Sequence, residues 1–331
     1  MKVFTRDYRI KSEYPEVFAR YFEGMRPCVL DIESTGLDPS RCKAVLAGLL
    51  TPTDNGVRVT QFLAENHYEE DRVLNATMEF LEEEDIDYLI TFNGQAFDIP
   101  FLNSRLERTF DKRRISLYGF DLYRFLQKCT DLRSRLPSMS QKSLEQHFGI
   151  ISDRNDTISG RESVAMFDEY SLTGNSTLEK IILTHNREDV LHLHRLMLLS
   201  LGETADFDAA MALYGFPVLG GRFSCRPYIS KAKKLLRING DQITAPVSAA
   251  YFPDLDCPVT AVFAATTSTY EIDAPAGRLG DDFYIDLTPL GIRLSSDPDC
   301  INNYLILNSR TINLISRLIL EQFGSRLSEA S

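Results

Sequence analysis

Two acidic residues stand two positions apart in a short apolar stretch, PCVLDIEST, at residues 27–35. Asp31 and Glu33 would point the same way in an extended strand, because alternate side chains of a strand share a face. Two carboxylates held side by side repel each other unless they share a proton or a cation. The spacing therefore indicates a cation site. The alternative, which an isolated pair would favour, is a turn cap after the strand.

Further chemistry-bearing residues occur in two later segments that also contain apolar residues. Asp98 lies in TFNGQAFDIPFL, residues 91–102, where a predicted strand ends and a helix begins, so its alternative role is to cap that helix. His185 and Asp189 lie four residues apart in HNREDV, a spacing that places both on one face of a helix. Their alternative role is a pair on the exposed side of that helix.

Convergence of these four carboxylates would require compensating positive charge. Mg²⁺ and Mn²⁺ are hard cations that prefer oxygen ligands, and Mg²⁺ is commonly held by one or two carboxylates together with substrate phosphate and water. Two such ions about 4 Å apart can hold the attacking and leaving oxygens of an in-line phosphoryl displacement. The acidic set therefore predicts two divalent cations, Mg²⁺ or Mn²⁺, and chemistry on a phosphodiester.

The segments that must position these residues alternate between strand and helix patterns. Asp31 and Glu33 fall in the first of three consecutive strands, and the turn sequence TDNG joins the second strand to the third. Helices and further strands follow in turn, which predicts an α/β fold with a mixed sheet and helices on both faces. The predicted strands cover 27–35, 42–52, 56–64, 87–94 and the start of 115–126, and the predicted helices cover 69–84, 98–110, the end of 115–126, 142–149 and 177–201.

A change in composition divides the chain. Residues 202–222, which include GFPVLGGRF, are rich in glycine and proline and are interpreted as a linker. The sequence predicts one domain at 1–201 and a smaller C-terminal α+β domain at 223–331. The latter combines short strands with a helix at 309–324, where Gly324 is expected to end the helix. The role expected for this domain is accessory, with a protein partner as one option.

Composition limits the class of protein. The chain has 331 residues, 44% hydrophobic and 25% charged, as in ordinary globular proteins. No apolar run approaches the roughly 18 residues that span a bilayer, so no membrane association is expected. The charged N-terminal segment lacks the apolar core of a signal peptide. Six scattered cysteines without a C-x-x-C pattern indicate neither a disulfide framework nor a zinc site. A cytoplasmic location fits these features best.

Charge is distributed unevenly along the chain. The net charge of −11 argues against indiscriminate binding of polyanions. Residues 104–143, however, hold ten lysines and arginines against four acids, and residues 222–237 hold six basic residues and no acid. Each run taken alone would be read as a solvated face. Together they predict a local basic track that guides a phosphate backbone.

The three segments, in this order, resemble the Exo I, Exo II and Exo III motifs of the DnaQ-like (DEDD) 3′–5′ exonuclease superfamily, which has an RNase H-like fold. DIESTGL resembles the first motif and HNREDV the third. FNGQAFDIPFL resembles the second motif in the form seen in the YprB-type branch and in proofreading domains of family B polymerases. SLEQHFGI and ISGRESVAMFDEY also resemble the YprB-type pattern, and the resemblance covers roughly residues 25–200.

The resemblance implies a role for each residue of the set. Asp31 would bridge both metal ions, Glu33 and Asp189 would bind the ion that activates water, and Asp98 would hold the second ion. His185 would be the general base, kept neutral by the neighbouring cations. The superfamily's His form usually separates His and Asp by five positions, whereas this chain has the four-residue spacing of the Tyr form. Residues expected to contact the substrate are Thr35, Asn93 and Phe97, with the hydrophobic core as the alternative for Phe97.

The expected activity is that of a metal-dependent 3′–5′ exonuclease acting on nucleic acid, DNA or RNA, at single-stranded ends. One alternative is a catalytically idle nucleic-acid-binding module of the same fold. Another is a structure-specific RNase H-like endonuclease. Asp121, which follows a predicted strand, is expected to support the structure rather than to bind metal.

Overall fold

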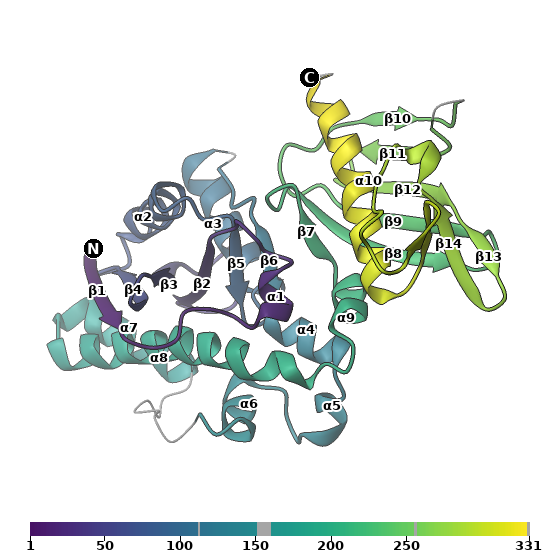
Figure 1. Ribbon diagram of the computed structural model, residues 1–331. Helices are drawn as coiled ribbons and strands as arrows, with labels where there is room; N and C mark the ends of the chain where they lie inside the picture. The colour runs from purple at the N-terminus through teal and green to yellow at the C-terminus, as the bar shows by residue number, and fades with distance from the viewer. Residues whose placement is uncertain (112, 151–159, 255–256, 330–331) are drawn as a thin grey trace. The chain divides into compact units, whose positions relative to one another are not determined.

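The computed structural model describes residues 1–111, 113–150, 160–254 and 257–329 (Figure 1). These residues form two compact units, Met1–Glu203 and Thr204–Ser331, and each is described by itself. The domain limits drawn from the sequence stay a prediction. The segment 202–222 contains helix α9 (Phe207–Tyr214) and strand β7 (Phe216–Val218). Gly215 follows the end of α9 with φ 105°, and Pro217 is the middle residue of β7, an edge strand, where proline is tolerated.

The first unit is built on a mixed six-stranded sheet in the order β1-β4-β3-β2-β5-β6. Within the series β1-β4-β3-β2, neighbouring strands are antiparallel. Strands β5 and β6 continue the sheet beyond β2 and run parallel to it. The predicted meander of three strands is thus confirmed. The bounds are β1 (Lys2–Tyr8), β2 (Pro27–Ser34), β3 (Ala44–Thr53), β4 (Gly56–Leu63), β5 (Tyr88–Thr91) and β6 (Tyr118–Asp121).

Helices cover both faces of this sheet, as predicted (Figure 1). Helices α2 and α3 pack on β3, and α2 also packs on β4. On the other side the long helix α8 runs across β2, β3 and β4, and α7 packs on α8 and β2. The bounds are α1 (Glu16–Ala19), α2 (Glu70–Glu83), α3 (Asp98–Phe110), α4 (Leu122–Cys129), α5 (Leu132–Arg135), α6 (Gln141–His147), α7 (Gly160–Thr173) and α8 (Ser176–Ser200), followed by a 3-10 helix at Leu201–Glu203.

Strand β2 carries both apolar and acidic side chains because its two faces meet different neighbours. Leu30 and Ile32 are buried in the apolar core of the first unit, and Asp31 and Glu33 alternate with them. The strand is central, with β3 on one side and β5 on the other, but β5 pairs only as far as Val29. The acidic pair therefore lies beyond the end of the parallel pairing, where the edge of β2 is open to other groups.

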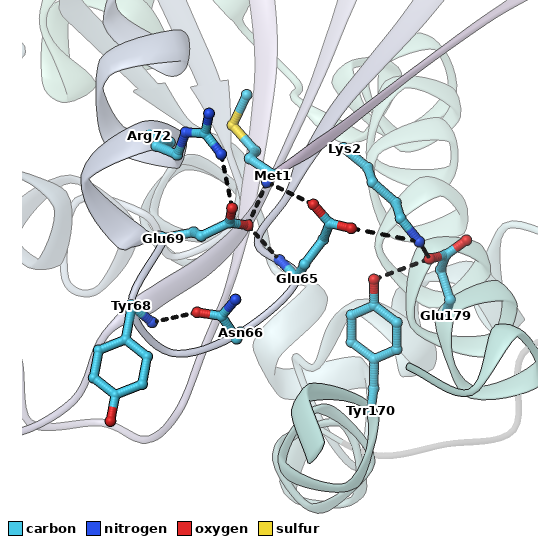
Figure 2. A network of polar contacts seen from close by, with 9 residues as sticks. All are labelled: Met1, Lys2, Glu65, Asn66, Tyr68, Glu69, Arg72, Tyr170 and Glu179. Atoms are coloured by element: carbon cyan, nitrogen blue, oxygen red, sulfur yellow. Dashed lines mark hydrogen bonds and ion pairs between the residues drawn. The ribbon is translucent and has the colours of Figure 1, made fainter. Parts of the chain in front are cut away.

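Polar contacts fix edge strand β1, which the sequence analysis did not predict (Figure 2). Lys2 forms an ion pair with Glu179 of α8, and the Tyr170 hydroxyl of α7 donates to Glu179 at 2.9 Å. The N-terminal amine pairs with Glu69 and lowers the pKa of that carboxyl to about 2. These contacts therefore connect helices α7 and α8 to strand β1 of the sheet. Most of its side chains are exposed, so the strand shows little of the apolar pattern by which strands are recognised.

The second unit is rich in strands, with two helices of eight residues or more. Its larger sheet is antiparallel, in the order β10-β11-β12-β9-β8-β7, and its smaller sheet has the order β13-β14-β16-β15. This agrees with the predicted C-terminal α+β domain. The remaining bounds are β8 (Phe223–Ser230), β9 (Leu235–Asp241), β10 (Ala249–Tyr251), β11 (Thr260–Ala264), β12 (Thr269–Pro275), β13 (Gly277–Leu279), β14 (Asp282–Asp286), β15 (Cys300–Ile301), β16 (Tyr304–Ile306), a 3-10 helix (Thr288–Leu290) and α10 (Ser309–Glu329).

Helix α10 begins where the sequence predicts but continues past the predicted end. Gly324 does not cap the helix; it lies within it, and a Cβ at this position would stand 2.2 Å from Cδ1 of Leu219. The glycine is therefore explained by close packing rather than by chain termination. Within the described part of the chain, no helix combines the length and the apolar character needed to cross a membrane.

Candidate metal centre

Three potential metal ligands from two elements meet at helix α8 and strand β2. The ligand atoms of Glu33, His185 and Asp189 all lie within 4.8 Å of one another. His185 Nε2 is 3.4 Å from Glu33 Oε1 and 3.6 Å from Asp189 Oδ2. Glu33 and His185 are buried, and the Asp189 side chain is 18% exposed. Strand and helix thus present one carboxylate each to the imidazole, from a largely enclosed position.

Asp31 and Asp98 border this group. The Ile32 amide, which lies beyond the last β5 pairing, donates to Asp98 Oδ1 at 3.3 Å. Asp98 therefore occupies the open edge of β2 next to the acidic pair. The cap position of α3 is Phe97, and Asp98 is the first helical residue. Asp98 is therefore not the N-cap residue of α3, which was its alternative role.

The electrostatic state of these carboxylates follows from burial and like charge. Burial raises the pKa of Asp31 well above its usual range, and the nearby charges of Asp189, Asp98 and Glu33 raise it further. Burial likewise raises the pKa of Glu33 to about 7, against the opposing effect of His185. The pKa of Asp98 also rises to about 7, mainly through burial. Such a group of acids is stable near neutral pH only when protons or cations compensate the charge.

Two neutral side chains that the sequence analysis did not assign hold the acidic pair. The Ser163 hydroxyl, on α7, donates to Glu33 Oε2 at 2.9 Å. The Asn186 amide, on α8, donates to Asp31 Oδ2 at 2.9 Å. Both residues lie in quoted motifs, ISGRESVAMFDEY and HNREDV, although residues 158–159 of the first lie outside the described part of the chain. Their chemical type gives no signal of this role, because buried Ser and Asn are common for structural reasons.

The three predicted substrate contacts occupy different surroundings. Thr35 closes the end of the β2–β3 ladder, where its Oγ1 accepts from the Lys43 amide at 3.0 Å. Asn93 has φ 63° and an exposed side chain. Phe97 is partly buried and packs against the core with its ring centroid 5.5 Å from that of Phe101, as in its alternative role. Contact of these residues with a substrate stays a prediction.

Asp121 has the supporting position expected for it. Its buried carboxylate accepts from the amides of Asn93 at 2.9 Å, Gln95 at 3.1 Å and Arg124 at 3.2 Å. These bonds cap helix α4 and shape the turn that leads to Asp98.

Several arginines of the two basic runs, residues 104–143 and 222–237, form ion pairs within the protein. In residues 104–143, arginines pair with acids elsewhere in the fold, and in residues 222–237 two arginines do the same. Lys112 lies outside the described residues. The pairs are Arg105–Glu70, Arg113–Glu82, Arg135–Glu203, Arg226–Asp241 and Arg237–Asp273. Acids from other segments therefore balance part of the predicted local excess of positive charge.

Comparisons with known proteins locate the site within a recognised family. A family model described as RNase_H superfamily matches residues 28–200, just over half of the chain, and this range contains Asp31, Glu33, Asp98, His185 and Asp189. The family B DNA polymerase from the hyperthermophilic archaeon Pyrobaculum calidifontis is similar at 18% identity, with a TM-score of 0.39. That match covers 57% of this chain and 28% of the polymerase chain. A comparison with curated proteins found no match.

Proposed function

This chain belongs to the RNase H superfamily, and on that premise we propose that its first unit is a divalent-metal-dependent nuclease of the DEDD type that removes nucleotides from 3′ ends. Membership of the superfamily supports nuclease activity in general. The observation that carries the finer proposal is the convergence of Glu33, His185 and Asp189 beside Asp31. The order and form of the three motifs support a place in the YprB-type branch.

The donor set fits Mg²⁺ or Mn²⁺. Its oxygen ligands are carboxylates. Burial raises the pKa values of Asp31, Glu33 and Asp98, and a bound cation would compensate the negative charge of these groups when they are ionised. Asp31, Glu33, Asp98 and Asp189 would hold two such ions. When bound, the ions supply Lewis-acid stabilisation of the negative charge that develops on the phosphoryl oxygens.

His185 is placed to act as the base for the attacking water. Its Nε2 faces the carboxylates of Glu33 and Asp189, so a proton taken up there remains next to negative charge. The four-residue spacing directs both α8 side chains to one site, as helical geometry requires. Ser163 and Asn186 orient the two carboxylates of β2 by donating to one oxygen of each. Nucleic acid with a free 3′ end is the proposed substrate.

A digestion panel tests this function. The linear substrates are 5′-labelled single-stranded DNA and RNA, duplexes and RNA–DNA hybrids. An internally labelled single-stranded circle is added, and each substrate is tested with Mg²⁺, Mn²⁺ or EDTA. The proposal predicts stepwise shortening of linear strands from the 3′ end, intact circles, and no reaction in EDTA. Asp31→Ala should reduce the rate at least about 100-fold.

Other outcomes of the panel identify the alternatives. Cleavage of circles would mean an endonuclease of the same fold. Binding of oligonucleotides without cleavage by the wild-type protein would mean a catalytically idle module. Either result would contradict the proposed exonuclease.

A further inference from the structure

Two buried amide side chains form a relay that ends on Asp31. Gln61, on strand β4, donates from Nε2 to Asn186 Oδ1 at 2.8 Å. Asn186, on helix α8, donates from Nδ2 to Asp31 Oδ2 at 2.9 Å and to the Asp31 backbone oxygen at 3.2 Å. Gln61 is 3% exposed and Asn186 is fully buried. The relay thus joins two strands through a helix in the interior of the first unit.

The chemistry of the amides fixes the direction of the relay. Gln61 Nε2 also donates to the Leu183 oxygen at 3.0 Å, so the amino group of Gln61 faces α8. An amide oxygen only accepts and an amide nitrogen only donates. With its oxygen bound to Gln61, Asn186 must turn its amino group toward Asp31. A rotated amide would bring its oxygen against the carboxylate, and it would lose the bond from Gln61 and both bonds to Asp31.

Strand β3 leaves the space that Asn186 occupies. Gly48 lies opposite Asp31 in the β2–β3 register. A Cβ on Gly48 would stand 2.1 Å from Asn186 Oδ1 and 2.8 Å from its Nδ2, far inside contact distance. The backbone of Gly48 does not require glycine, since its φ is not positive. A glycine inside a strand weakens it, and close approach of another group is one reason for its presence.

We propose that Asn186 is a positioning residue for Asp31, with Gln61 setting the direction of its amide and Gly48 providing its space. An amide bound to one carboxylate oxygen, and to the backbone of the same residue, fixes the plane of the carboxylate. A metal ligand needs that fixed orientation, and partners of this kind affect metal affinity. The inference rests on the proposed function in one respect, that Asp31 is a metal ligand.

Direct titration with Mn²⁺ tests this role without any need for nuclease activity. The wild-type protein and Asn186→Ala are compared by calorimetry, with circular dichroism and thermal melting as controls for folding. We expect Asn186→Ala to bind Mn²⁺ about 10-fold more weakly, in line with the usual cost of removing a partner of a metal ligand. Gln61→Met, which keeps Asn186 but releases its amide, should show a smaller loss in the same direction.

A double-mutant cycle tests the space at Gly48. Gly48→Ala should weaken Mn²⁺ binding by displacing the Asn186 side chain. In Gly48→Ala/Asn186→Ala the atoms that would clash are gone, so the added methyl group should cause no further loss. Asn103→Ala is the matched control, because Asn103 is a buried amide of the first unit that bonds the Ile115 backbone at 2.7 and 3.3 Å. It should lower the melting temperature and leave Mn²⁺ affinity unchanged.

The outcomes separate the relay from the proposed function. Equal Mn²⁺ affinity in the wild-type protein and in folded Asn186→Ala overturns the relay and leaves the metal site in place. Absence of Mn²⁺ binding in the wild-type protein rejects the metal site, and the role of Asn186 with it. If Asn186→Ala does not fold, the Mn²⁺ affinities of Gln61→Met and Gly48→Ala provide the test. Wild-type Mn²⁺ affinity in both variants would overturn the proposal.

Discussion

His185 Nε2 lies 3.4 Å from Glu33 Oε1, so the imidazole of helix α8 faces the carboxylate of strand β2. Asp189, one helical turn later, lies 3.6 Å from the same nitrogen. The four-residue spacing of His and Asp is therefore compatible with a shared site. In the proposed function, His185 would take up a proton here while the carboxylates would hold the cations.

Removal of the base should affect turnover more than binding. We expect His185→Ala to lower kcat at least about 100-fold with little change in KM, because general-base catalysis typically contributes factors of this size. Steady-state kinetics, together with Mn²⁺ titration, measure kcat, KM and metal affinity. A loss of Mn²⁺ affinity as large as the loss of kcat would instead make His185 a metal ligand.

The metal-free protein should lose stability as pH rises toward neutrality. Burial raises the folded-state pKa of Glu33 and Asp98 to about 7, above their ordinary values of 4.5 and 3.8. Between these limits the folded state binds more protons than the unfolded state, so the free energy of unfolding falls with increasing pH. We expect a decrease of roughly 5 kcal/mol from pH 5 to pH 8 in EDTA, about half of it from each carboxyl.

Denaturant unfolding at several pH values measures this slope. Saturating Mg²⁺ or Mn²⁺ should remove most of it, because a bound cation compensates the ionised carboxylates. Glu33→Gln should flatten the slope in EDTA. Equal stability of the metal-free protein at pH 5 and pH 8 would show that the pKa values of these carboxyls are not raised in the folded state.

Ser163 should support activity through Glu33. Its hydroxyl donates to Glu33 Oε2 at 2.9 Å, and Ser163→Ala removes that bond from a buried carboxylate. We expect roughly a 10-fold loss of activity or metal affinity. Ser171→Ala is the control on the same helix, since Ser171 is partly exposed and its hydroxyl donates to the Asp168 backbone oxygen. Equal effects of the two substitutions on rate and on Mn²⁺ affinity would argue against a specific role for Ser163.

Arg105 should stabilise the fold rather than bind phosphate. It forms a two-bond ion pair with Glu70 at 2.5 and 2.7 Å, both side chains are nearly buried, and Glu70 also accepts from the Ala44 amide. Arg105→Met should cost about 3–5 kcal/mol of unfolding free energy by leaving a buried charge unpaired. Arg105→Met/Glu70→Gln should recover part of that loss in denaturant unfolding. If Arg105→Met is as stable as the wild-type protein but binds nucleic acid more weakly, Arg105 belongs to the predicted basic track after all.

Periodicity explains what could be predicted of the site. The two-residue repeat of a strand places Asp31 and Glu33 on one face, and the helical repeat does the same for His185 and Asp189. The strand and helix order then follows from hydrophobic pattern, and the mixed sheet with helices on both faces is observed. These features depend on local sequence alone.

Contacts between distant segments explain what could not be predicted. Asn186 reaches Asp31 only because α8 crosses the sheet at Gly48, a relation set by packing. The balance of Arg105 by Glu70 likewise joins residues that are remote in sequence, so a local count of charges overstated the basic track. Strand β1 escaped prediction because its exposed edge position leaves no apolar alternation.

The most direct test of the central claim is the rate at which a 5′-labelled single-stranded oligonucleotide is shortened in Mn²⁺ by the wild-type protein and by Asp189→Asn. This substitution preserves the shape of a side chain that lies in the ligand cluster and removes its charge. The wild-type protein should give a ladder of products shortened from the 3′ end. EDTA should suppress this ladder, and Asp189→Asn should reduce the rate at least about 100-fold. Equal rates for the two proteins, or shortening that continues in EDTA, would contradict the central claim.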